Sequence, residues 1–141
     1  MNIKVLTKDI IYLIHQDVIE QYGGTPGNYN NTDDKIESIL AQQYPFFGHD
    51  QYPSVFEKAA MLLYFFVKDH WFCDGNKRVA LQSAIVLLKI NGFEDKLPQH
   101  ESYMKMNAVA ESQIMEENRA QYICGIANWL RSRFVRLRES P

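Results

Sequence analysis

The sequence predicts an all-α protein, a helical bundle with two buried central helices. Apolar residues recur mostly at the three- and four-residue spacing of amphipathic helices. Two long segments, Ser54 to Asp69 and Asn76 to Ile90, are apolar nearly all round, as helices in the middle of a bundle are. The alternation typical of strands is confined to Ile3 to Leu6 and to the Thr25 to Asn31 segment.

Composition sets the size and the broad class. With 141 residues, the chain is expected to form a single domain over 1–141 that needs no disulfide or structural metal. Hydrophobic residues at 46% exclude a disordered chain, and a net charge of -2 is too close to neutral for a bulk nucleic-acid binder. The two cysteines, Cys73 and Cys124, form no secreted disulfide framework, so we expect a cytoplasmic protein.

The N-terminal part is expected to hold two helices. Thr7 is an N-cap, Asp9 lies in the favourable first turn, and Gly23-Gly24 ends the helix. Residues Thr25 to Asn31 are rich in Gly, Pro and Asn, which indicates a loop or a short hairpin. A second helix begins at Thr32, with an apolar face of Ile36, Ile39 and Leu40.

Capping signals mark the later helices. Ser54 and Glu57 form a capping box at the start of the first central helix, and Asn91-Gly92 closes the second. A further helix is expected from about Glu101 to Met115. The last helix is expected from Asn118, with an apolar stripe of Ile123, Ala127, Leu130, Phe134 and Leu137.

The segment that joins the two central helices carries the polar groups. It reads His70-Trp71-Phe72-Cys73-Asp74-Gly75-Asn76-Lys77-Arg78. A loop that enters a helix N-terminus presents free N–H groups and the positive end of the helix dipole, which bind anions. Gly75 allows close backbone approach, and Asn76 can cap the helix and contact a phosphate. Lys77 and Arg78 add two positive charges beside them.

Asp74 and His70 supply the remaining parts of a site. Asp74 offers a hard oxygen ligand for Mg²⁺, and the imidazole of His70 can act as a general base. Cys73 next to His70 leaves a Cys–His nucleophile as an alternative, although nothing marks an oxyanion site for it. A zinc site lacks a third and fourth ligand nearby. The loop therefore has the parts that a phosphoryl or nucleotidyl transferase needs.

The string HWFCDGNKR resembles the signature of the Fic/Doc family, His-x-Phe-x-Asp/Glu-Gly/Ala-Asn followed by a basic pair. The pair Lys77-Arg78, where most Fic proteins have Gly-Arg, is similar to the death-on-curing (Doc) branch. The resemblance covers roughly Ile3 to Gly92 and includes the stretches DVIEQYGG, YPSVFEKAA and LLKINGF.

This resemblance implies an all-α Fic fold and an ATP-dependent transferase. Fic enzymes move AMP to a protein hydroxyl, whereas the Doc branch moves the γ-phosphate of ATP to a Thr of elongation factor Tu and stops translation. His70 would be the base, Phe72 the core anchor and Asp74 the Mg²⁺ ligand. The Thr25 to Asn31 loop lies where the family has a target-docking flap. The ATP phosphates would be held by Gly75, Asn76, Lys77 and Arg78.

Two departures from the Fic pattern favour phosphate transfer over AMP transfer. The second Arg of many Fic enzymes is Leu81 here, and Lys77 replaces a Gly, so a triphosphate is expected to bind reversed, with its γ-phosphate beside His70. The family's self-inhibition motif fails at Ser112 to Glu116, because Glu117 follows it. Inhibition would then come from a separate Phd-like antitoxin whose disordered tail folds onto the toxin.

Other interpretations remain beside these. A non-catalytic module would use the anion site only to bind a nucleotide or partner, and would have no need of His70 in register with Asp74. His15 is expected to be a satisfied core residue, and Cys124 a buried small hydrophobe. The last arginines are expected to form a solvated helix face, with a dimer contact or an acidic partner as the alternative: Arg131, Arg133, Arg136 and Arg138.

Overall fold

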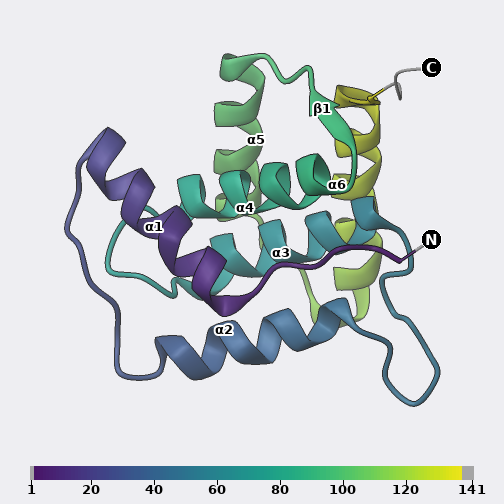
Figure 1. Cartoon of the computed structure of the whole chain (residues 1–141), viewed down its shortest axis with the longest axis horizontal. Helices are drawn as coiled ribbons and strands as arrows, with labels where there is room; N and C mark the ends of the chain where they lie inside the picture. The colour runs from purple at the N-terminus through teal and green to yellow at the C-terminus, as the bar shows by residue number, and fades with distance from the viewer. Residues whose placement is uncertain (1, 138–141) are drawn as a thin grey trace.

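The computed structural model describes residues 2–137, and the regular secondary structure of this part of the chain is almost entirely helical (Figure 1). The six α-helices are α1 Lys8–Tyr22, α2 Thr32–Leu40, α3 Val55–Asp69, α4 Asn76–Ile90, α5 Gln99–Glu111 and α6 Arg119–Arg133. Two short 3₁₀ helices and two short strands complete it: η1 Ala41–Gln43, η2 Glu116–Asn118, β1 Phe93–Asp95 and β2 Phe134–Arg136. The all-α prediction is confirmed.

Local capping chemistry sets the helix ends that the sequence predicts. The Thr7 side chain accepts a hydrogen bond from the Ile10 N–H at 3.4 Å, and α1 ends at Gly23, whose φ is 80°. At the start of α3, both bonds of the Ser54–Glu57 capping box are present. These ends depend on residues three or four apart, so they are readable from sequence.

The central pair α3 and α4 forms the middle of the bundle. Figure 1 shows the two helices side by side, with α2 below them and α5 and α6 running across them. Helix α3 also packs on α6, and α4 packs on α1. Two residues of the connecting segment, Trp71 and Phe72, belong to the core at 0% and 2% exposure. The polar segment is therefore tied into the core.

The chain after α6 differs from the expected helix. Residues 134–136 form β2, which pairs antiparallel with β1 so that Phe134 lies opposite Asp95. The Lys96 N–H donates to the Arg133 carbonyl at 2.7 Å, and the Leu137 N–H donates to the Gly92 carbonyl at 2.8 Å. These long-range bonds end the helical ladder, so the prediction that Phe134 and Leu137 continue a helical stripe is wrong.

Other expectations are corrected by contacts made at a distance. Helix α5 ends at Glu111 and not near Met115. At this end of the helix, the Lys68 ammonium donates to the carbonyls of the last turn. Among the described residues, Ile3 to Leu6 belongs to no strand. Instead, the Gln43 side-chain amide bonds both the N–H and the carbonyl of Leu6 at 3.0 Å.

The C-terminal arginines bind within the chain. Arg131 donates to the Ser54 hydroxyl at 3.0 Å, and Arg133 donates to the Glu101 carboxylate at 2.7 Å. Arg136 lies over the Phe93 ring, and Arg138 lies outside the described residues. These side chains tie α6 and β2 to α3, α5 and β1.

Cys124 is exposed, so its predicted burial is wrong. A membrane-spanning helix is not found within residues 2–137.

Candidate active site

The polar segment starts at the end of α3 with His70. This residue is exposed and has a left-handed backbone, φ 46° and ψ 65°, which is uncommon for a residue other than glycine. The chain then turns inward, because Trp71 and Phe72 are buried, and Cys73 and Asp74 return to the surface. The buried pair Trp71 and Phe72 therefore anchors the segment in the core, with the exposed His70 before it and the exposed Asp74 after it.

Phe72 is fixed by three neighbours. Its ring stacks on His15, with ring centroids 3.8 Å apart and planes at 8°, and meets the edge of Tyr12 at 5.9 Å. The Asn76 amide accepts from the Phe72 N–H at 3.0 Å and donates to the Phe72 carbonyl at 2.8 Å. The expectation that Asn76 caps α4 is wrong, since the N-cap is Gly75 and the Asn76 amide is engaged with the loop.

Gly75 makes the entry into α4 possible. Its φ is 81°, and a Cβ at this position would lie 3.2 Å from a methyl carbon of Val18. The positive φ favours glycine, and the absence of a Cβ avoids a tight contact with Val18. The Val79 N–H donates to the Gly75 carbonyl at 2.9 Å and so starts the helical ladder. The N–H groups of the preceding turn have no acceptor within the helix, so this end attracts an anion.

The Asp74 carboxylate is held by two backbone N–H groups. Oδ2 accepts from Thr25 at 3.1 Å, and Oδ1 accepts from Gly75 at 2.8 Å. The Thr25 N–H, followed by the Gly75 N–H, lowers the pKa of Asp74 below its ordinary value, so the group is ionised at neutral pH. Each oxygen still has a lone pair to offer, and the side chain is exposed. Such a carboxylate suits Mg²⁺, which binds proteins through one or two carboxylates and completes its shell with phosphates and water.

A zinc site on the motif finds no support. The one group of three close metal-ligating side chains within residues 2–137 is Asp33, Asp34 and Glu37 on α2. It includes neither His70 nor Asp74, and its Asp33 and Glu37 carboxylates bind the Lys8 ammonium at 3.0 and 2.6 Å. Asp74 is therefore the candidate cation ligand of the motif itself.

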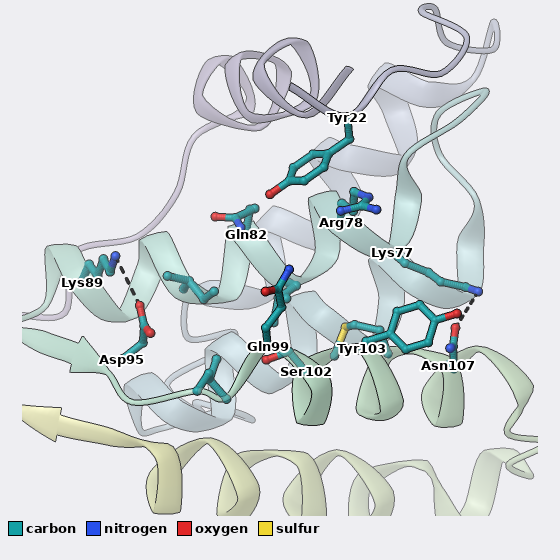
Figure 2. A pocket seen from close by; sticks show the side chains of 14 residues that line it. Tyr22, Lys77, Arg78, Gln82, Lys89, Asp95, Gln99, Ser102, Tyr103 and Asn107 are labelled. Carbon is teal, nitrogen blue, oxygen red and sulfur yellow. Dashed lines mark hydrogen bonds and ion pairs between the residues drawn. The ribbon is translucent and has the colours of Figure 1, made fainter. Parts of the chain in front are cut away.

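Lys77 and Arg78 open onto a cavity of about 570 Å³ between α4, α5, β1 and the end of α1 (Figure 2). The Arg78 guanidinium lies over the Tyr22 ring, 3.9 Å from its centroid. Figure 2 shows Lys77 extending to α5, where its ammonium donates to the Asn107 side chain at 2.9 Å. The cavity has apolar side chains from α4, α5 and the β1–α5 loop: Leu81, Ile85, Leu97 and Met106. Its size is that of a small-molecule site.

The loop from Thr25 to Asn31 runs against the motif, as the sequence suggests. The Cys73 N–H donates to the Gly27 carbonyl at 3.1 Å, and Asn28 forms an isolated antiparallel bridge with Phe72. Within the described residues this is one bridge and not a hairpin of paired strands. The loop lies beside the part of the motif that carries Cys73 and Asp74 and leaves Asp74 exposed.

The motif residues therefore fall into two groups. His70 and Asp74 lie at the loop surface, whereas Lys77 and Arg78 line the cavity, which neither His70 nor Asp74 borders. Sequence reasoning missed the residues that hold these groups from other elements. These are His15, Tyr22, Gly24, Thr25 and Asn107. The sequence carried a signal for three of them, since Tyr22 and Gly24 belong to the stretch DVIEQYGG of the family resemblance and Thr25 begins the expected flap loop.

A model of the Fic/DOC family matches residues 5–88, which is more than half of the chain and includes the whole motif. The chain belongs to the Fic/DOC family. It is 29% identical over 89 residues to "Protein kinase doc" of Escherichia phage P1, a match that covers 63% of this chain and 69% of that protein. It is 39% identical over 57 residues to "Toxin Doc" of Mycolicibacterium smegmatis, covering 40% of this chain and 44% of that protein.

Proposed function

We propose that this chain is a Doc-like toxin that transfers the γ-phosphate of ATP to a hydroxyl of a protein target. One observation carries the proposal. A single anchored loop presents an exposed His70, an ionised Asp74 and the N-terminus of α4 in sequence. The similarity to proteins named as a kinase and as a toxin supports it.

In the proposed reaction, His70 accepts the proton of the target hydroxyl while that oxygen attacks the γ-phosphorus. A new O–P bond forms, the bond to the β-phosphate oxygen breaks, and ADP leaves. The free N–H groups of α4, Lys77 and Arg78 bind the phosphate oxygens and stabilise their charge. Asp74 would hold Mg²⁺, which neutralises phosphate charge when bound. A general base of this kind contributes about 10²–10⁴-fold to the rate.

The cavity beside the motif supports the choice of ATP as donor. Its volume of about 570 Å³ lies within the roughly 300–1,000 Å³ of small-molecule sites. Lys77 and Arg78 contribute two cations to its wall, and Leu81 contributes an apolar side chain where many Fic enzymes have a second arginine. A γ-phosphate deep in the site would have no such clamp. We therefore favour a reversed triphosphate, with the γ-phosphate beside His70.

AMP transfer is the second candidate, because the chain belongs to a family in which that reaction is the commoner one. The Lys77 side chain extends to α5, where it binds Asn107, and does not lie across the N-terminus of α4. Phosphates in front of that N-terminus would therefore be compatible with the structure. The two reactions differ only in which phosphorus stands beside His70, so product analysis decides between them.

We further propose elongation factor Tu as the target and a Phd-like antitoxin as the partner that restrains the toxin. Both rest on the resemblance of the motif to the Doc branch, and the similarity to proteins named as a kinase and as a toxin supports that resemblance. Modification of a translation factor would place the activity in the cytoplasm. The two free thiols, Cys73 and Cys124, agree with a reducing compartment.

Incubation of purified elongation factor Tu with the chain, Mg²⁺ and ATP labelled at either the α- or the γ-phosphate tests the proposal. We expect label from γ-labelled ATP only, and an intact mass increase of one phosphate. The His70→Ala variant serves as the blank. Label from α-labelled ATP would establish AMP transfer instead, and label from neither would remove this target.

A further inference from the structure

Asp74 is held by two hydrogen bonds from outside the motif, one from α1 and one from the turn that follows it. We call these two bonds the grip. The His15 Nε2–H donates to the Asp74 backbone carbonyl at 3.1 Å, and the Thr25 N–H donates to the Asp74 carboxylate at 3.1 Å. These donors are distant in sequence from Asp74 but only ten residues apart from each other. One short stretch therefore fixes both the main chain and the side chain of the same residue.

His15 reaches the motif through two contacts of different kinds. It is 7% exposed, stacks on Phe72 and bonds the Asp74 carbonyl. Because a carbonyl oxygen can only accept, the proton of the neutral ring lies on Nε2. The ring thus links the buried anchor of the loop to the residue two positions later.

Gly24 provides the space for the second contact. A Cβ at this position would lie 2.8 Å from Asp74 Oδ2 and 3.1 Å from Cγ, and the residue has a φ of +118°. Gly23 is its natural comparison. It has a φ of +80°, but a Cβ there would meet no atom within 4 Å. Both residues have backbones that favour glycine, but only Gly24 is pressed against the Asp74 carboxylate.

We propose that His15 and Gly24 are positioning residues that set where the Asp74 carboxylate stands relative to the N-terminus of α4. A carboxylate side chain turns freely about two bonds unless its surroundings select one rotamer. The bond from Thr25, with Gly24 allowing close approach, selects the rotamer before any ligand binds, and the bond from His15 fixes the main chain that carries the side chain. The catalytic consequence of this inference rests on the proposed function, whereas the grip itself does not.

Gly24→Ala and Gly23→Ala form a matched pair for the first test, because both add a methyl group at a positive φ. Hydrogen exchange of the Thr25 amide reports the bond to Asp74, and Mn²⁺ binding followed by electron paramagnetic resonance reports the carboxylate. Gly24→Ala is expected to remove the Thr25 protection and weaken Mn²⁺ binding about 10- to 100-fold, as loss of an orienting contact does at metal sites. Gly23→Ala should keep both near the native values. Equal behaviour of the two variants would overturn the role of Gly24.

His15→Phe and His15→Gln separate the two contacts of His15. Phe keeps a ring to stack on Phe72 but has no donor, whereas Gln keeps an N–H donor without the ring. We expect His15→Phe to weaken Mn²⁺ binding and lower kcat by about 10-fold or more, and His15→Gln to recover most of both. Unfolding in urea measures the stability that each variant loses. Native Mn²⁺ binding and kcat in His15→Phe would leave His15 a packing residue only.

The two proposals can fail separately. If the native chain transfers neither phosphate nor AMP, the proposed function fails, while Thr25 exchange in the two glycine variants still decides the grip. If the native chain is active and Gly24→Ala keeps its Thr25 protection, the grip fails and the proposed function stands. Leu13→Ala, on the exposed side of α1, is the control for a general effect on that helix.

Discussion

The side-chain amide of Asn76 closes a ring with the backbone of Phe72, accepting from its N–H at 3.0 Å and donating to its carbonyl at 2.8 Å. The residues between them, Cys73 to Gly75, are thereby held in a short closed loop. Because Phe72 is buried, this ring is fixed to the core. The first residue of α4 thus serves the loop before it, which is why Asn at this position matters more for geometry than for capping.

Replacing Asn76 should loosen this ring. Asn76→Ala leaves the Phe72 N–H and carbonyl without these partners, and we expect a loss of about 1–3 kcal/mol in the free energy of unfolding. Asn76→Asp keeps an acceptor but turns a second acceptor toward the Phe72 carbonyl, so it should be no better than Ala. Urea unfolding measures both. Asn118→Ala is the control, since that N-cap side chain makes no capping bond. Native stability in Asn76→Asp would contradict the orientation of the Asn76 amide.

His70→Ala is expected to abolish turnover and leave the fold intact. The side chain is exposed at the end of α3, so its removal costs the core nothing, while a general base contributes about 10²–10⁴-fold. Initial rates with ATP and the target, together with circular dichroism, check both halves. His100→Ala, another exposed histidine, should keep native rates. Near-native turnover by His70→Ala would exclude it as the base.

Asp74→Asn is expected to remove the dependence of activity on Mg²⁺. The substitution neutralises the exposed carboxylate that we assign to the cation while keeping its size. Rates measured across a Mg²⁺ titration should fall to a level that added Mg²⁺ no longer raises. Asp17→Asn, on the exposed surface of α1, provides the comparison. An unchanged Mg²⁺ midpoint in Asp74→Asn would contradict the assignment.

The contact between α5 and α6 should weaken in acid. The Arg133 guanidinium, and then the Trp129 N–H, lower the pKa of Glu101 below its ordinary value of 4.5. A lowered carboxyl pKa means that the stabilising contribution is present above the ordinary pKa and is lost as the pH falls through the folded-state pKa. Glu101→Gln should therefore be less stable than the native chain at pH 7, and the difference should shrink at low pH. A difference that does not vary with pH would show that the charge has no part in it.

Features that depend on neighbours in sequence were predictable. The Thr7 cap and the Ser54–Glu57 capping box act over three residues, and both ends lie where predicted. The end of the last helix was not predictable in this way. Phe134 and Leu137 keep a helical spacing, but pairing with β1, about forty residues earlier, gives residues 134–136 a different partner.

The candidate site likewise has a part that could be predicted from neighbouring residues and a part that depends on long-range contacts. The motif residues could be assigned from one string, because its residue types and spacing carry the chemistry. What holds the motif could not, since His15 and Thr25 meet Asp74 only after the chain has folded. Burial of His15 was predicted, and its role was hidden because a buried histidine alone does not reveal its partner. Cys124 was misjudged because residue type does not say which side of α6 faces the core.

The burial of Trp71 and Phe72 has a thermodynamic consequence for the loop that contains them. A segment opens on its own when few apolar contacts are lost in opening. Here a local opening would expose two aromatic side chains of the main core, which brings its free energy close to that of unfolding the whole domain. The loop therefore lacks a melting transition of its own. In denaturant, we expect the geometry of the loop to survive as long as the bundle does and to disappear with it in one cooperative step.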